Sequence, residues 1–157
     1  MKVTLLVVGK TTDKHIIALV EEYLNRLKHY VPTDIEVIPE LRQTKALTPE
    51  QQKHDEGELI LQRIQPGDRV VLLDEHGVER RSIEFAQWMQ KKMSSGTKRL
   101  LCIVGGPYGF SPEVYARCDE KISLSQMTLS HQMIRLLFVE QVYRAMTILR
   151  GEPYHHE

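Results

Sequence analysis

The chain has 157 residues, of which 41% are hydrophobic and 27% are charged, a composition typical of a globular protein that is long enough for one domain with a packed core. Its 21 Lys and Arg residues balance its 21 Asp and Glu residues, and a formal net charge of zero argues against a free-standing nucleic-acid binder, whose affinity comes from a basic surface. Cys102 and Cys118 lack zinc or redox spacing, and no apolar run approaches the roughly 20 residues that span a bilayer, so we expect a cytosolic protein without metal, disulfide or membrane anchor.

In the first half of the chain, apolar runs typical of strands alternate with amphipathic stretches typical of helices. The opening apolar run leads directly into Gly9 without a small-residue cleavage site, which favours a first strand over a signal peptide. Pro39 ends the second strand, and Pro49 suits the first turn of a polar helix. The expected elements are a strand over 2–8, a helix over 14–30, a strand over 35–38, a loop over 40–48 and a helix over 49–64.

The second half continues this alternation with more apolar strands. Pro66-Gly67-Asp68 predicts a turn, Ser82 and Ser111 are placed to cap helices, and Gly151 is placed to end the last helix. The expected strands cover 69–73, 100–104 and 121–124. The expected helices cover 83–93, a short stretch from 112, and 130–150. A charged loop around Gly77 is expected after the strand over 69–73.

This order of elements predicts an α/β fold, a mainly parallel sheet flanked by helices, over 1–157 as a single domain. In such sheets ligands bind beyond the carboxyl ends of the strands. Three segments lie there: the residues after Leu73, the glycine-rich loop after Val104 and the loop after Leu124. We therefore expect the functional site where these three segments meet.

Two of these segments have a distinctive composition. Gly105-Gly106-Pro107-Tyr108-Gly109 lacks the order G-x-G-x-x-G and the G-K-[ST] ending, which disfavours a dinucleotide-dependent oxidoreductase or a phosphate loop. Its glycines permit close approach of a ligand, although a plain strand-to-helix turn explains them equally well. The uncharged connection 124–129 offers backbone groups for the edge of an adenine ring and Met and Leu side chains for its faces; a packed connection without a ligand is the alternative.

The expected last helix is apolar around nearly its whole circumference, so it should be buried on more than one side. In so short a chain a subunit interface is the natural second partner, and the alternative is a central helix in a monomer. His131 and Arg135 lie one turn apart near its amino end, where an RNA phosphate or a deprotonated base is favoured, although a histidine there can also be purely structural. The tail 151–157 has two histidines without a third ligand nearby, so no metal site is predicted.

Three ordered motifs carry a resemblance to a known family. They are Val7-Val8-Gly9-Lys10, then Ile103-Val104-Gly105-Gly106-Pro107-Tyr108-Gly109, and then a long block of Leu124-Ser125-Gln126-Met127-Thr128, His131-Gln132-Met133, Arg135, Glu140-Gln141-Val142-Tyr143-Arg144-Ala145 and Gly151-Glu152-Pro153-Tyr154-His155. With these motifs the chain resembles, over essentially its full length, the ribosomal RNA large subunit methyltransferase H family of the SPOUT superfamily. One departure is Ser130, where many relatives have proline before the histidine.

The resemblance implies a cytoplasmic methyltransferase that uses S-adenosylmethionine and forms N3-methylpseudouridine in 23S ribosomal RNA, with the assembled ribosome as substrate. It implies a deep C-terminal trefoil knot and a homodimer in which Tyr154 and His155 of one subunit complete the site of the other. The implied cofactor site consists of Leu73, Gly105, Leu124, Ser125, Gln126, Met127, Thr128 and Leu129. A net charge of zero suits a protein that meets its RNA inside a ribosome.

Methyl transfer from a sulfonium to an imide nitrogen joins a cation to an anion once the nitrogen has lost its proton, so a water-poor pocket assists it. We expect the base to be surrounded by His131, Arg135, Tyr154 and His155, with Arg135 holding a phosphate or developing anion and His155 as a candidate proton acceptor. Two alternatives remain open: a knotted methyltransferase that acts on transfer RNA or another ribosomal nucleotide, and a non-catalytic ribosome-associated dimer with the same fold.

Overall fold

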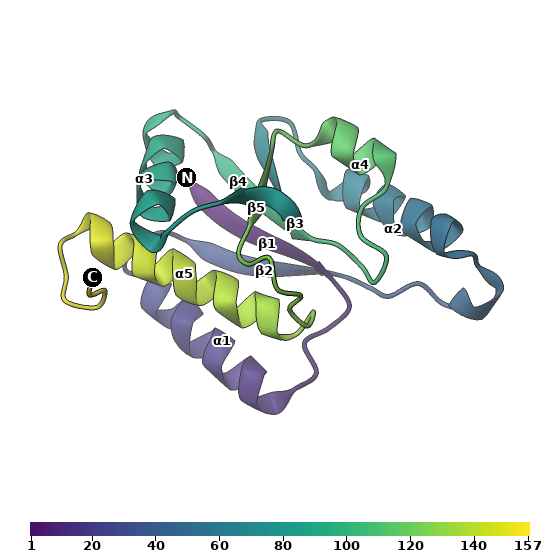
Figure 1. The fold of residues 1–157 in the computed structure, drawn as a ribbon, viewed down its shortest axis with the longest axis horizontal. Coiled ribbons are helices and arrows are strands. Elements are labelled where there is room, and N and C mark those ends of the chain that lie inside the picture. The colour runs from purple at the N-terminus through teal and green to yellow at the C-terminus, as the bar shows by residue number, and fades with distance from the viewer.

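The computed structural model describes residues 1–157 and contains a five-stranded sheet in the order β2-β1-β4-β3-β5 (Figure 1). The strands are β1 (Lys2–Val8), β2 (Thr33–Ile38), β3 (Asp68–Glu79), β4 (Arg99–Val104) and β5 (Glu120–Ser123). Each pair of neighbouring strands is parallel. The α/β fold with a parallel sheet, predicted from the alternation of elements, is therefore confirmed.

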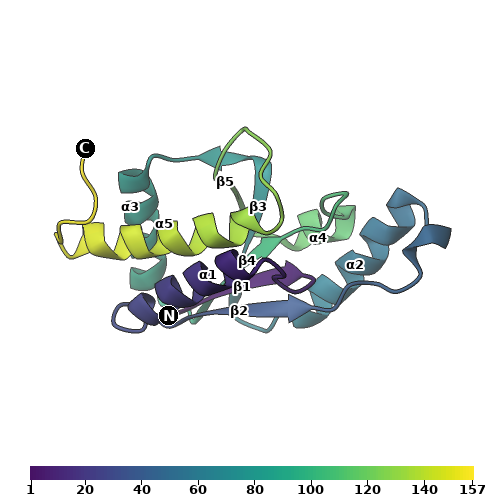
Figure 2. The same ribbon diagram turned by 90° about the horizontal axis from the view of Figure 1, so that it is seen from below.

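Helices cover both faces of this sheet. They are α1 (Lys14–Leu27), α2 (Pro49–Arg63), α3 (Ser82–Ser94), α4 (Pro112–Arg117) and α5 (Met133–Leu149), with a short 3-10 turn at Thr44–Ala46. One hydrophobic core joins the sheet to α1, α3 and α5, and a second joins its opposite face to α2 and α4 (Figures 1 and 2). None of these helices is long and apolar enough to cross a membrane.

The central strand β4 shows why the sequence folds into three layers. All six of its residues are buried. Leu100 and Cys102 belong to the core under α1, α3 and α5, whereas Leu101 and Ile103 belong to the core under α2 and α4. A strand between two helix layers buries both of its faces, which requires the continuous apolar run found in this segment.

Helix α2 is held by its first turn and by one close contact. The Oγ1 atom of Thr48 accepts the N–H of Gln51 at 3.1 Å, and Oε1 of Gln51 accepts the N–H of Thr48 at 2.9 Å, which forms a capping box. Further along, Gly57 lies against the side chains of Ser111 and Val114, where any Cβ atom would collide. This glycine therefore lets α2 pack directly on the loop and helix that follow β4.

The prediction of a charged loop after Leu73 is wrong. These residues continue β3 through a bulge, because the register with β5 shifts between Leu73 and Val78, which both pair with Ile122. Gly77 approaches β5 so closely that a Cβ atom would lie 2.6 Å from the backbone N and C atoms of Ile122. The charged residues face away from the core, so their composition indicated a loop where the backbone remains extended.

The prediction that Ser82 caps the helix α3 is also wrong. The residue before α3 is Arg81, whose backbone N–H donates to the Glu84 carboxylate at 2.8 Å. The Ser82 hydroxyl instead donates to Oε1 of Gln141 at 2.9 Å and links α3 to α5. The cap at Ser111 is confirmed, since its Oγ accepts the N–H of Val114.

The last helix ends as predicted, at Gly151 in the left-handed region with φ +67°. Its first turn begins later than expected, at Met133, and the Ser130 hydroxyl accepts the Met133 N–H at 3.0 Å. Beyond Gly151 the tail turns back onto the helices, and the hydroxyl of Tyr30 in the loop after α1 donates to the Glu152 carboxylate at 2.5 Å. This hydrogen bond is the main cause that raises the pKa of Tyr30 to about 12, so the phenol remains a donor at neutral pH.

Candidate functional site

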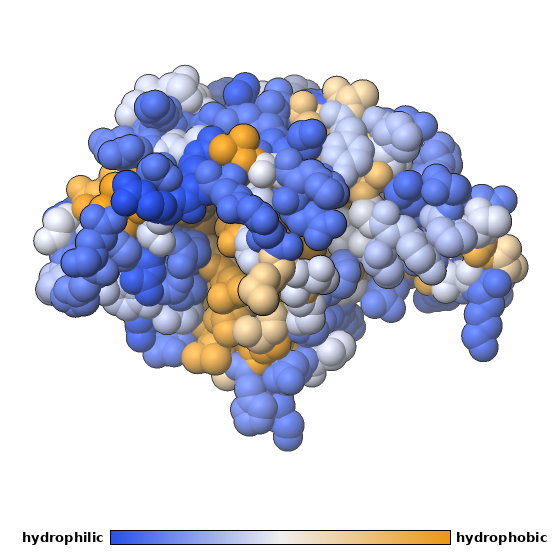
Figure 3. Space-filling model, viewed as in Figure 1, coloured by the Kyte–Doolittle hydropathy of each residue, from blue (hydrophilic) through white to orange (hydrophobic).

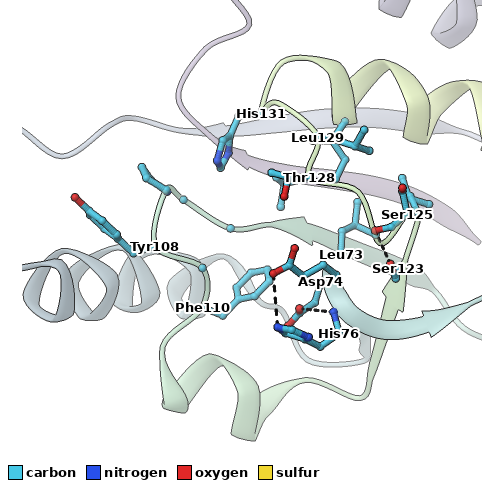
Figure 4. A pocket seen from close by; sticks show the side chains of 18 of the residues that line it. Leu73, Asp74, His76, Tyr108, Phe110, Ser123, Ser125, Thr128, Leu129 and His131 are labelled. Carbon is cyan, nitrogen blue, oxygen red and sulfur yellow. Dashed lines mark hydrogen bonds and ion pairs between the residues drawn. The ribbon is translucent and has the colours of Figure 1, made fainter.

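A cavity of about 430 Å³ opens at the carboxyl ends of β4 and β5 and at the bulge of β3 (Figure 4). Its walls come from three stretches of chain that follow Leu73, Val104 and Ser123, together with the start of α5. The volume lies within the range of small-molecule sites in proteins. The sequence predicted that the segments after Leu73, Val104 and Leu124 meet at one site, and the structure brings them together around this cavity, although the first is a bulge inside β3 and not a strand end.

The β3 wall of the cavity carries a carboxylate. Asp74 accepts the backbone N–H of His76 at 2.9 Å through Oδ1 and the hydroxyl of Tyr115 at 2.5 Å through Oδ2. Burial and the bond to Asp74 raise the pKa of Tyr115 above its usual range, so this hydroxyl remains a donor. The pair ties α4 to the bulge of β3 and places a negative charge on the cavity wall.

The glycine-rich loop forms the second wall with its backbone. The N–H of Gly109 donates to the carbonyl of Gly106 at 3.1 Å, and Gly109 has a φ of +82°, a conformation that favours glycine. Phe110 is buried and packs edge-on against Tyr115, whereas Tyr108 is half exposed at the rim (Figure 4). A ligand here meets main-chain atoms at positions 105 and 106.

The loop 124–129 forms the third wall and is shaped by its own serines. The Ser123 hydroxyl donates to the carbonyl of Ser125 at 2.9 Å, and Oγ of Ser125 accepts the N–H of Met127 at 2.9 Å. Met127 is 79% exposed, so its side chain is free to cover a ligand. Of the expected cofactor residues, those that line the cavity are Leu73, Gly105, Leu124, Ser125, Met127, Thr128 and Leu129. Gln126 is exposed and does not line it.

His131 and Arg135 do not point into the same place: His131 lies in the turn before α5, and Arg135 lies in the first turn of the helix. His131 lines the cavity, opposite Asp74 and Phe110 (Figure 4). Arg135 is 1% exposed and donates to the carbonyl of Val8 and to Oγ1 of Thr11, both at 3.0 Å. The expectation that Arg135 holds a phosphate in the cavity therefore disagrees with the geometry, because the side chain turns toward the end of β1 and fixes the loop before α1.

Tyr154 and His155 belong to a polar cluster at the other end of α5. The Tyr154 hydroxyl donates to Oε1 of Glu140 at 3.0 Å and lies 3.1 Å from the hydroxyl of Tyr23. Burial and these two hydrogen bonds raise the pKa of Tyr154 above its usual range. Arg144 donates to Glu140 at 2.7 Å and lies 3.2 Å from Nδ1 of His155.

The contact with Arg144 favours one tautomer of a neutral His155 ring. A guanidinium has donors only, so Nδ1 of His155 accepts from Arg144 and the ring proton of the neutral imidazole lies on Nε2. That Nε2 atom is buried and has no partner within this chain. In this arrangement Nε2 of His155 offers a hydrogen-bond donor, and the role of His155 as a proton acceptor stays a prediction.

One chain therefore does not bring the four expected catalytic residues together. Neither Tyr154 nor His155 lines the cavity. The cavity lies at the amino end of α5, whereas the tail follows its carboxyl end and reaches back only to Glu140, in the middle of the helix (Figures 1 and 2). Reasoning from the sequence also missed Glu140 and Arg144 as members of the tail cluster, although both lie in the motif that carried the resemblance. Their i, i+4 spacing on a helix was the available signal.

Residues 1–155 match the model of the predicted SPOUT methyltransferase family. The chain is 64% identical over 157 residues to a ribosomal RNA large subunit methyltransferase H of Bacteroides fragilis and 63% identical to that of Phocaeicola vulgatus, and each alignment covers all of both chains. The chain belongs to this family. As a SPOUT methyltransferase it uses S-adenosylmethionine as methyl donor.

A solved structure shows the same fold at low sequence identity. The tRNA (m1G37) methyltransferase from Aquifex aeolicus superposes with a TM-score of 0.55 and 15% identity, over 100% of this chain and 76% of that one. At this identity the similarity concerns the fold alone. It agrees with the parallel sheet and helical layers described above.

Proposed function

We propose that this family member methylates N3 of a pseudouridine in the large-subunit ribosomal RNA of the assembled ribosome, as a homodimer. The observation that carries the proposal is the cavity built by the segments after Leu73, Val104 and Ser123, which offers a methyl donor both backbone atoms and a carboxylate. The substrate is inferred from relatives named ribosomal RNA large subunit methyltransferase H, at 55–64% identity over nearly the whole chain.

The cavity fits S-adenosylmethionine in size and chemistry. The glycine-rich loop and the loop 124–129 present main-chain groups that suit an adenine edge, and Leu129 and Met127 are apolar groups for its faces. Asp74 places a negative charge where a sulfonium cation is favoured. When bound, the donor supplies an electrophilic methyl group; the protein's own residues hold it and exclude water.

A second subunit would account for the apolar surface of α5 and for the separation between the tail cluster and the cavity. The helix is apolar around most of its surface, and apolar side chains gather over it where it runs beside α1 (Figure 3). Met133 on α5 and Leu19 on α1 are 41% and 42% exposed. A homodimer that buries this surface would also bring the tail cluster of one subunit to the cavity of its partner, which one chain cannot do.

In such a shared site the tail cluster would act on the imide of the base. The N3 atom must lose its proton, and the anion that forms is shared with the flanking carbonyl oxygens. We expect Nε2–H of His155 to donate to one of these oxygens, with the positive charge of Arg144 held behind it by Glu140. His131, on the cavity wall, is a further candidate for moving the proton.

The direct test is methylation by the purified protein with labelled S-adenosylmethionine. The substrates are ribosomes, separated large subunits, free 23S RNA and free transfer RNA, followed by mass mapping of the product. We expect label on one pseudouridine of the large-subunit RNA in ribosomes. Methylation of transfer RNA instead, or no binding of the donor, would contradict the proposal.

A mixed-dimer experiment tests whether the site is shared. One subunit carries Gly105→Val, whose side chain would press on Phe110 and the backbone of Gly109 and distort the cavity wall, and the other carries His155→Ala. If each site combines the cavity of one subunit with the tail of the other, half of the dimers in an equal mixture are mixed and each has one intact site, so about a quarter of full activity returns. If both parts come from one subunit, the mixture stays inactive.

A further inference from the structure

Helix α2 places a buried carboxyl group behind the glycine-rich loop. Glu56 is 4% exposed, and its Oε1 atom is buried without a hydrogen-bond partner. The three heavy atoms nearest to a Cβ atom at Gly106 all belong to this carboxyl group, and the Cβ atom would collide with it. Because Gly106 also lines the cavity and Glu56 does not, the carboxyl group supports the loop from its far side.

The residue after Glu56, Gly57, also contacts the segment that follows β4. Gly57 lies against Ser111, whose hydroxyl caps α4 at the end of the same loop. Two successive residues of α2 thus touch the loop after β4 near its beginning and at its end. The position of the loop is therefore coupled to the position of α2.

A carboxyl group is an unexpected choice for this contact. An apolar side chain of similar volume would fill the space without the cost of burying an unpaired polar group. Burial raises the pKa of Glu56, and the negative charge of Glu40 raises it further. The observation that matters is the contact itself: a polar group is buried without a partner where it touches the glycine-rich loop.

We propose that Glu56 is a positioning residue, whose carboxyl group supports the glycine-rich loop at Gly106 and thereby sets the shape of the methyl-donor cavity. The inference rests on the proposed donor site. It explains why α2 buries a carboxyl group against the glycine-rich loop. It also accounts for the glycine at position 106: its φ is not in the left-handed region, and a Cβ atom there would collide with the carboxyl group of Glu56.

The test measures S-adenosylmethionine affinity by calorimetry and separates KM from kcat in the methylation assay. We expect Glu56→Gln to bind the donor within about twofold of the original protein, because the amide keeps the size and shape of the carboxyl group that touches Gly106. Glu56→Ala should weaken donor binding about tenfold or more and raise KM more than it lowers kcat. Glu58→Ala, on the exposed side of the same helix, is the matched control and should leave affinity unchanged.

A second substitution makes the contact itself measurable. Gly106→Ala should weaken donor binding because the new methyl group displaces Glu56, and adding Glu56→Ala should restore part of that loss because it clears the space. If the losses of donor affinity in the two single variants simply multiply in the double variant, the inference is overturned. A Glu56→Ala protein that binds the donor as tightly as the original protein would also overturn it. If the unaltered protein fails to bind the donor, the proposed function fails instead. Melting temperatures of all variants separate loop effects from unfolding.

Discussion

Replacing Gly77 with alanine should separate β3 from β5 at the wall of the cavity. The new Cβ atom would lie 2.6 Å from two backbone atoms of Ile122, whereas carbon contacts are comfortable at about 3.5–4.0 Å. One of the strands must therefore move by about 1 Å, and backbone in a sheet cannot rotate away as a side chain does. The pairs Val78↔Ile122 and Glu79↔Ser123 lie directly at the clash.

We expect Gly77→Ala to cost about 3 kcal/mol, the upper end of the usual range for overpacking, and to lower the melting temperature by about 6–12 °C. Donor affinity should also fall, because Ser123 and Leu124 line the cavity just beyond the displaced pair. Calorimetric melting and titration with S-adenosylmethionine measure the two effects. Gly67→Ala is the control: it has open space and only backbone strain at φ +86°, at about 1 kcal/mol. Equal melting temperatures for the two variants would refute the reasoning.

Three further predictions concern single side chains. Asp68→Asn should cost about 3 kcal/mol in urea unfolding, because it breaks a buried bidentate pair with Arg99 that Glu36 only partly replaces. Burial alone would raise the pKa of Asp68, but the hydrogen bonds from Arg99 and from the Gln65 N–H, with the positive charges of Arg99 and Arg117, together outweigh it and lower the pKa below 3.8. The stabilisation by the pair is thus present above pH 3.8 and is lost as the pH falls through the folded-state pKa; an Asp68→Asn protein with an unchanged loss of stability in acid would contradict this. Arg135→Met should lower stability by about 2 kcal/mol and leave the KM for ribosomes nearly unchanged, since Val8 and Thr11 lose their donors; a large rise in KM would show that Arg135 does meet RNA. His131→Ala should change stability by less than about 0.5 kcal/mol but reduce kcat at least about tenfold, and full activity would remove His131 from the reaction.

Local signals predicted most of the fold. Apolar runs such as 100–104 define strands buried on both faces, and Pro49, Ser111 and Gly151 mark helix ends where the structure has them. The bulge of β3 was missed because an exposed, charged stretch has the same composition whether it forms a loop or an edge of sheet. Its extended backbone depends on pairing with β5, which lies more than 40 residues away in sequence.

The position of the cavity was predicted from the sequence, but the directions of some of its expected side chains were not. The cavity follows from a general property of parallel sheets, so its three walls were found from the expected strand ends alone. The direction in which Arg135 points was not predicted, because the helix begins at Met133, so His131 is not one helical turn away, and because the partners of Arg135, Val8 and Thr11, lie more than 120 residues away in sequence. The knot and the dimer remain predictions from family resemblance, since each depends on the path of a whole chain or on a second copy.

The position of β4 has a consequence for how this protein is made. β4 lies between β1 and β3, so the middle of the sheet is filled by residues 99–104, well after both neighbours have been synthesised. Until then the inner edges of β1 and β3 have unpaired peptide groups and invite association with other nascent chains. Co-translational folding should therefore pause at this stage, and a stalled chain that ends before residue 99 should be the species most dependent on chaperones.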